Sequence, residues 1–158
     1  GQAHRGSAPY QMFKTADGYI TVGGAQENFW GSLCKVLSCE HLLNDPRYKS
    51  KKDRVKNHVP LARDLTAFFE NYLTEDISKL LDEAGIPAGP VLNHVEVFNN
   101  PQTIERGMVQ PVYHSKVGNM RTLGSPVKLS KTPAKISTSA PLLGEHNDEV
   151  LADWNIYN

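Results

Sequence analysis

The sequence has few cysteines and no long apolar run. Its two cysteines, Cys34 and Cys39, match neither a disulfide framework nor a metal-ligand spacing. No apolar segment approaches the length needed to cross a bilayer, and the N-terminal residues lack the character of a signal peptide. We therefore expect a protein of a reducing compartment, placed in the cytoplasm and without a membrane partner.

The sequence also lacks an excess of charge of either sign. Lys and Arg together number 17, as do Asp and Glu, so no global field would draw the chain towards nucleic acid. One local cluster is basic, and it comprises Lys49, Lys51, Lys52, Arg54 and Lys56. Because only Tyr48 supplies an aromatic ring beside it, we interpret the cluster as a solvated helix face rather than a phosphate site.

No complete catalytic or metal-binding motif occurs. None of the six histidines stands at ligand spacing from another His, a Cys or an acid. Gly124-Ser125-Pro126 lacks the strand–elbow–helix context of a hydrolase nucleophile. We interpret the histidines as surface or capping residues. The motifs by themselves predict no catalytic residue and no metal site.

Residues 9–24 predict a β-hairpin around which the chain is organised. A first extended run, residues 10–15, leads into Asp17-Gly18, a dipeptide that tolerates the positive φ of a tight turn. A second run, residues 19–22, is rich in β-branched and aromatic residues. It ends at Gly23-Gly24, where a bare backbone permits either a plain turn, which we favour, or the close approach of a ligand.

Apolar residues at helical spacing predict several helices after this hairpin, of which the strongest runs through Leu61, Leu65, Phe68, Phe69 and Tyr72. Side chains that would cap helices are Ser50, Thr74, Asn93 and Asn100. The expected core contains Phe29, Leu33, Leu65, Phe68 and Phe69, with Cys34 as a buried thiol. Residues 86–91 are too rich in proline for a central strand and predict an extended crossing segment.

The character of the chain changes after residue 108. Residues 109–114 and 120–123 predict a second hairpin, and residues 127–129 a short strand. Residues 131–140 are Ser-, Thr- and Pro-rich and predict a surface linker before a last helix bearing Val150, Leu151 and Trp154. Hairpins and helices are segregated rather than alternating, so the predicted class is α+β: a small antiparallel sheet covered by several helices, with a C-terminal return segment.

Several short motifs are distributed in order along almost the whole chain. They are Gly-x-x-His-x-x-x-x-Pro-Tyr-Gln-x-Phe-x-Thr-x-Asp-Gly-Tyr-Ile-x-Val at residues 1–22, Asp45-Pro46-Arg47-Tyr48, Arg54-x-x-Asn57, Gly85-Ile86-Pro87-Ala88-Gly89-Pro90-Val91, Asn100-Pro101-Gln102, Arg106-Gly107-Met108, Gly124-Ser125-Pro126 and Pro141-Leu142-Leu143-Gly144-Glu145-His146. This set resembles the C-terminal region of the family III CoA-transferases. That family includes formyl-CoA transferase, crotonobetainyl/carnitine CoA-transferase, succinate–hydroxymethylglutarate CoA-transferase and α-methylacyl-CoA racemase.

The resemblance implies a part of an enzyme. Members of the family join a large CoA-binding domain to a small α+β domain, interlock as homodimers, and take a coenzyme A thioester as substrate with no other cofactor. Residues 1–108 would form the small domain, with an opening loop at residues 1–8, and residues 109–158 would return to the large domain. The family nucleophile is an aspartate in the N-terminal half, in a Tyr-Asp-x-x-x-Gln-Ala context that this chain lacks. No catalytic residue is therefore assigned, and the isolated chain is expected to be inactive.

The same resemblance implies a lid over the acyl end of the substrate. Its residues would be His4, Gly6 and Tyr10 in the opening loop, with Gly23 and Gly24 allowing close approach of the backbone. Three functions stay open at this point. The chain is part of a CoA-transferase that acts on an acyl-CoA and a carboxylic acid, part of a racemase-like enzyme, or a free-standing interaction module without catalysis.

Overall fold

The computed structural model describes residues 2–154. They fall into two compact units, Gly1–Val91 and Leu92–Asn158, and each unit is described by itself. Gly1, at the start of the expected opening loop, and residues 155–158 of the expected return segment lie outside the described residues. The division expected at residue 108 stays a prediction. Within the described residues no helix is long and apolar enough to cross a membrane.

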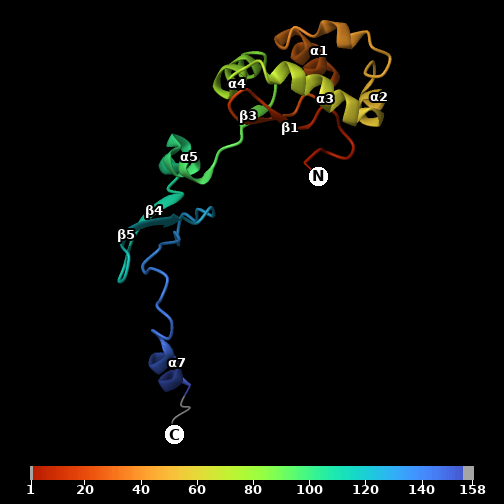
Figure 1. Ribbon diagram of the computed structural model, residues 1–158. Coiled ribbons are helices and arrows are strands. Elements are labelled where there is room, and N and C mark those ends of the chain that lie inside the picture. Colours follow the sequence, from red (N-terminus) through yellow and green to blue (C-terminus); the bar gives the residue numbers. More distant parts are fainter. Residues whose placement is uncertain (1, 155–158) are drawn as a thin grey trace. The chain divides into compact units, whose positions relative to one another are not determined.

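The predicted hairpin supplies two of the three strands of the sheet in the Gly1–Val91 unit (Figure 1). Strands β1 (Gln11–Lys14) and β2 (Tyr19–Val22) pair antiparallel, with Phe13 opposite Ile20. Strand β3 (Ala88–Pro90) pairs antiparallel with the other side of β2. The segment expected to be extended is thus an edge strand, a position at which a proline without an amide hydrogen is tolerated.

Helices cover this sheet. They are α1 (Glu27–Val36), the 3-10 helix η1 (Glu40–Leu43), α2 (Lys51–Lys56), α3 (His58–Phe69) and α4 (Thr74–Glu83). Helix α3 contacts β1, whereas α4 contacts α1, β2 and β3. Ser50 caps α2 as predicted, because its side chain accepts a hydrogen bond from the amide of Asp53 at 3.2 Å.

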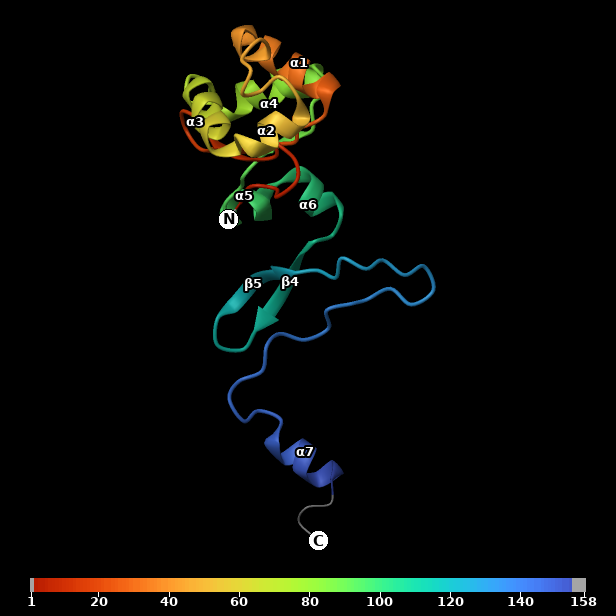
Figure 2. The same cartoon turned by 90° about the vertical axis from the view of Figure 1, so that its right-hand side faces the viewer.

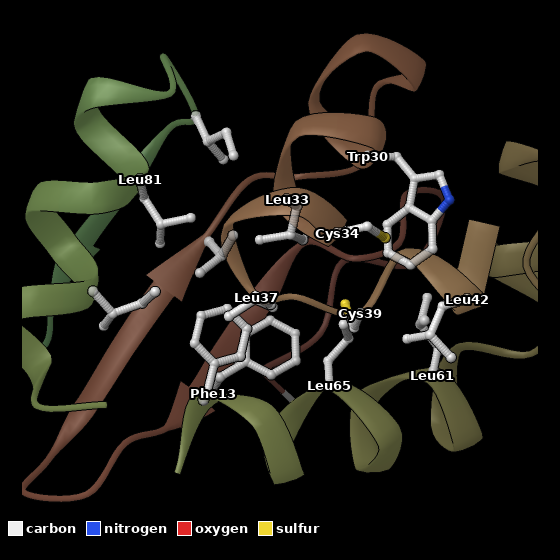
Figure 3. Packing of buried hydrophobic residues seen from close by; sticks show 14 of the residues in the cluster. Phe13, Trp30, Leu33, Cys34, Leu37, Cys39, Leu42, Leu61, Leu65 and Leu81 are labelled. Atoms are coloured by element: carbon white, nitrogen blue, oxygen red, sulfur yellow. The ribbon is translucent and has the colours of Figure 1, made fainter. Parts of the chain in front are cut away.

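The core lies between the sheet and these helices (Figure 3). Leu33, Leu65 and Phe69 are buried as predicted, and the Phe69 ring stacks on Phe13 with a centroid distance of 4.7 Å. Phe29 and Phe68 were expected to be equally buried, but both are only half-buried and pack against the margin of the core. They lie at the border of their apolar stripes, where helix periodicity does not distinguish inside from edge.

Helix α4 begins where predicted but is capped differently. The Thr74 side chain does not cap its own helix: its amide and hydroxyl both donate to Asp17 Oδ1, at 2.8 and 2.7 Å. The turn of the hairpin therefore supplies the acceptor at the N-terminus of α4. A carboxylate at this end is favoured by the free amides and the helix dipole.

The second unit contains α5 (His94–Asn99), α6 (Pro101–Glu105), β4 (Val109–His114), β5 (Gly118–Leu123) and α7 (Asn147–Asp153). Asn93 and Asn100 cap α5 and α6 as predicted, and β4 and β5 form the predicted second hairpin (Figure 2). The strand expected at residues 127–129 is wrong, because these residues form no ladder with a neighbour. With sheets of three and two strands among helices, the fold is α+β as predicted.

Candidate functional site

The opening loop folds back on the first strand, so that His4 lies beside Tyr10. The His4 amide donates to the Tyr10 carbonyl at 3.0 Å, and the centroids of the two rings lie 5.2 Å apart. His4 Nδ1 accepts a hydrogen bond from the Gly6 amide at 3.1 Å. That contact assigns the proton of the neutral imidazole to Nε2. The loop thus presents an imidazole and a phenol side by side.

Tyr10 lines two hollows in the Gly1–Val91 unit. The larger has a volume of about 590 Å³ and is also lined by His4, Met12 and Val22. The smaller has a volume of about 260 Å³ and is also lined by Gly23 and Phe29. The larger volume falls within the usual range for small-molecule sites, about 300–1,000 Å³. Its wall combines apolar side chains with polar groups that could orient a ligand.

The two glycines of the turn after β2 have different surroundings. Gly23 lines the smaller hollow, its amide donates to the Pro87 carbonyl at 2.7 Å, and a Cβ at this position would meet Pro87 at an ordinary 3.4 Å. Gly24 lines neither hollow and is buried, and a Cβ there would lie 2.8 Å from Leu33 Cδ2. Packing on the core therefore accounts for Gly24. Gly6 is exposed and also lines neither hollow.

Of the predicted lid residues, the structure thus gathers His4, Tyr10 and Gly23 around the hollows. Gly6 acts on them indirectly, through its bond to His4. Gly24 sets how closely the turn approaches α1. The arrangement can surround the apolar part of a ligand and offer hydrogen bonds to a polar group of the same ligand, but it contains no activated nucleophile.

Arg54 is the residue of this region that sequence reasoning misjudged. It was placed with the basic cluster on a solvated face, yet its side chain is 0% exposed. Its Nε donates to the Ala8 carbonyl, Nη1 to the Tyr48 carbonyl and Nη2 to the Ala25 carbonyl, each at 3.2 Å. Its guanidinium carbon lies 5.1 Å from the centroid of the Trp30 ring. A signal was present in the sequence, because Arg54 is the sole arginine of the cluster and opens the Arg54-x-x-Asn57 motif.

Glu27 supplies the counter-charge to Arg54. Its two carboxylate oxygens accept from Nη2 at 3.0 Å and from Nη1 at 3.3 Å. The hydrogen bonds and charge of Arg54 hold the pKa of Glu27 below its usual value. The same carboxylate accepts from the Lys51 amide at 2.9 Å, which ties α1 to the start of α2.

Within residues 2–154, no aspartate combines deep burial with a free carboxylate. Asp17 and Asp45 accept hydrogen bonds, chiefly from Thr74 and Arg47, and these bonds hold the pKa of each carboxyl below its ordinary value. Partial burial raises the pKa of Asp64, but hydrogen bonds from Tyr48 and Arg63 and the nearby arginine charges outweigh it and leave the pKa lowered. Asp53 is bound to the Ser50 side chain. The remaining aspartates are exposed: Asp76, Asp82, Asp148 and Asp153. Covalent catalysis by a carboxylate needs a buried, oriented group, and the aspartates of the described part of the chain do not meet that need.

Comparison with known proteins agrees with the fold and the motifs. The family model described as CoA-transferase family III matches residues 1–147. The chain is 36% identical to a human succinyl-CoA:glutarate CoA-transferase, over 97% of this chain and 35% of the relative. It is 28% identical to a succinate–glutarate CoA-transferase of Agrobacterium fabrum, over 97% of this chain and 38% of the relative. A crystal structure of a CAIB/BAIF family protein from Brucella suis superposes with a TM-score of 0.79 at 29% identity, covering 97% of this chain and 39% of that one. The chain therefore spans well under half the length of the proteins that it matches.

Proposed function

The chain belongs to CoA-transferase family III, and we propose that it is the C-terminal part of an enzyme that moves CoA between carboxylic acids. The observation that carries the proposal is the match of residues 1–147 to the family model, together with 36% identity to a succinyl-CoA:glutarate CoA-transferase. The relatives reported above are transferases, which favours CoA transfer over racemisation. Their additional length leaves room for the large CoA-binding domain that the family resemblance implies.

In the proposed reaction the nucleophile is an aspartate outside this chain. Its carboxylate attacks the thioester carbon of the acyl-CoA and expels CoA thiolate, which leaves a mixed anhydride on the enzyme. The thiolate then attacks the aspartyl carbonyl to give an aspartyl-CoA thioester and to free the first acid. The acceptor carboxylate then attacks the aspartyl-CoA thioester, which releases CoA thiolate and forms a second mixed anhydride. The thiolate attacks the acceptor carbonyl of this anhydride, which gives the new acyl-CoA and restores the aspartate.

The proposed contribution of this chain is a lid over the acyl end of the substrate. His4 and Tyr10 would close against the acyl group, with Gly6 holding the imidazole and Gly23 letting the backbone approach. Gly24 would set the position of that turn on the core. A lid acts by excluding water and by orienting the acyl group, so it accelerates transfer only when the nucleophile is present. We further propose that the whole enzyme is an interlocked homodimer.

The test compares this chain with the longer protein that contains it. Each is incubated with succinyl-CoA and a panel of acceptor acids that includes glutarate, and enzyme-bound acyl groups are trapped with hydroxylamine. We expect transfer and a trapped adduct for the longer protein, and neither for the isolated chain. Turnover or an adduct on an aspartate of the isolated chain would overturn the assignment of the nucleophile, and an inactive longer protein would overturn the function.

Tyr10→Phe tests the lid in the longer protein. Tyr113→Phe is the matched control, because Tyr113 is also exposed but lies in β4 of the other unit. Loss of the Tyr10 hydroxyl should lower kcat by about tenfold, the loss typical of one hydrogen bond made to the reacting group. Equal rates for the two variants would remove Tyr10 from the lid.

A further inference from the structure

Arg54 links two segments that border the candidate site. Ala8, which accepts from Nε, ends the opening loop and precedes Pro9-Tyr10. Ala25, which accepts from Nη2, follows Gly23-Gly24 directly. Both segments line the smaller hollow, through Ser7 and Tyr10 on one side and Gly23 and Ala25 on the other. One side chain therefore holds both walls of that hollow.

The hydrogen bonds of this guanidinium are complete. An arginine has five N–H donors in a rigid planar fork, and those of Arg54 have five acceptors: three backbone carbonyls and both oxygens of Glu27. A lysine ammonium has three donors on one atom and cannot span carbonyls spread around a plane. A surface arginine would be solvated by water. Arg54 is instead buried, and protein acceptors satisfy all five of its N–H donors.

We propose that Arg54 is a positioning residue that holds the opening loop and the Gly23-Gly24 turn together, so that the two walls around Tyr10 keep one relative placement. It touches neither substrate nor reacting atoms and acts through the backbone of Ala8 and Ala25. The consequence for catalysis rests on the proposed function, whereas the mechanical coupling of loop and turn does not. The two parts are therefore tested separately.

The coupling is tested on the 158-residue chain by amide hydrogen exchange. Two reporters are the amides of His4, bonded to Tyr10, and Gly23, bonded to Pro87. Arg54→Lys should speed the exchange of both by about tenfold or more, the change expected when a charge-assisted hydrogen bond is lost. The amides of Leu65 in α3 and Leu81 in α4 should not change. Lys52→Gln, an exposed change on the same helix, is the matched control and should leave all four amides unchanged.

Glu27→Gln keeps the proposal falsifiable if Arg54→Lys does not fold. It weakens the hold of Arg54 on the turn but leaves the bond to Ala8 intact. Exchange should therefore rise at the Trp30 amide, in the first turn of α1, and at Gly23, and should stay unchanged at His4. If either variant sped exchange at Leu65 in α3 and Leu81 in α4 as much as at Gly23, the effect would be a general loss of stability and the proposal would be overturned. Unchanged exchange at His4 and Gly23 in a folded Arg54→Lys variant would also overturn it.

The catalytic consequence is measured in the longer enzyme. Misplaced walls disturb the orientation of the acyl group, so Arg54→Lys should lower kcat by about tenfold or more while the KM for acyl-CoA changes by less than about twofold. Lys52→Gln should match the wild type. Loosened reporter amides with an unchanged kcat would overturn the role in catalysis. A wild-type enzyme without transfer would refute the proposed function, and the exchange pattern would then decide the coupling by itself.

Discussion

Individual side chains join segments that are distant in the sequence. Arg54 reaches Ala8 across 46 positions, and Asp17 reaches Thr74 across 57. Phe69 closes the core against Phe13 in the same manner. In each case a group from a helix is satisfied or covered by the hairpin region, so local changes at these residues should have effects beyond their own element.

Phe69→Ala should lower the free energy of unfolding by about 3–5 kcal/mol. The ring is fully buried and stacked on Phe13, and the surrounding helices and sheet can only partly close the cavity that its removal leaves. Phe68→Ala is the matched control on the same helix and should cost less, because Phe68 is half-buried. Urea unfolding followed by circular dichroism measures both. A larger loss for Phe68→Ala would contradict the observed packing.

Asp17→Asn should lower the melting temperature at neutral pH, and this deficit should disappear in acid. The pKa of Asp17 lies below its ordinary value of 3.8 because the Thr74 hydroxyl and amide donate to the carboxylate. A group whose pKa is lowered by folding stabilises the native state above its unfolded pKa, and this stabilisation is lost as the pH falls through the folded pKa.

The difference in melting temperature between wild type and Asp17→Asn should therefore be constant from about pH 5 to pH 8 and shrink below about pH 4. Asp82→Asn, an exposed change near the other end of α4, serves as the control. A deficit that persists unchanged in acid would show that the Asp17 charge does not act at the helix terminus.

At the scale of elements, the turn between β2 and α1 is set by core packing. Gly24 lies against Leu33 and Pro9, and a Cβ at Gly24 would force Leu33 to move. This contact fixes where α1 lies on the hairpin and hence where Gly23 stands beside Tyr10. The rigidity of the site thus depends on a residue that does not line it.

Gly24→Ala should cost about 1–3 kcal/mol of stability through overpacking. Gly31→Ala, within α1, is the control: no atom lies within 4 Å of the added Cβ, and alanine favours the helix, so stability should stay equal or rise. Denaturant unfolding compares the two. If Gly24→Ala were as stable as Gly31→Ala, the contact with Leu33 would not constrain the turn.

At the scale of the whole molecule, large apolar side chains remain exposed towards the C-terminus. Leu143 is 107% and Trp154 74% exposed, and Val150 in α7 is also exposed. Large exposed apolar side chains can mark a surface that another part of a protein covers. If this chain is part of a longer enzyme, the proposed large domain is the partner that would cover it.

The isolated chain should therefore either self-associate with rising concentration or exchange the amides of α7 rapidly. Sedimentation velocity over a range of concentrations measures the first, and hydrogen exchange the second. Leu143→Glu should suppress the association. Leu129→Glu, a change at another exposed leucine of this unit, is the control and should not suppress it. A compact monomer with a protected α7 would contradict the prediction.

The sequence by itself determined the features that depend on neighbouring residues. Ser50, Asn93 and Asn100 specified helix starts, because caps are formed within a few residues of the chain. The sequence also placed the turn of the first hairpin correctly, at residues 15–18, but neither Asp17 nor Gly18 adopts the positive φ expected of this dipeptide. The ordered motifs were enough to predict the family, and through it His4, Tyr10 and Gly23 as residues of one candidate site.

Only the tertiary structure decided which of several similar residues is buried and what it contacts. Arg54 belongs to the same basic cluster as several exposed lysines, so the sequence pattern does not set it apart. Its burial depends on the carbonyls of Ala8 and Ala25, which come from other segments. Phe68 and Phe69 are adjacent in one stripe, and the position of Phe13 selects Phe69. Thr74 is a typical cap by sequence, but Asp17 outcompetes it because a charged acceptor reaches the same helix end from the hairpin. Local sequence patterns do not predict such contacts, because each one joins residues that lie far apart in the sequence.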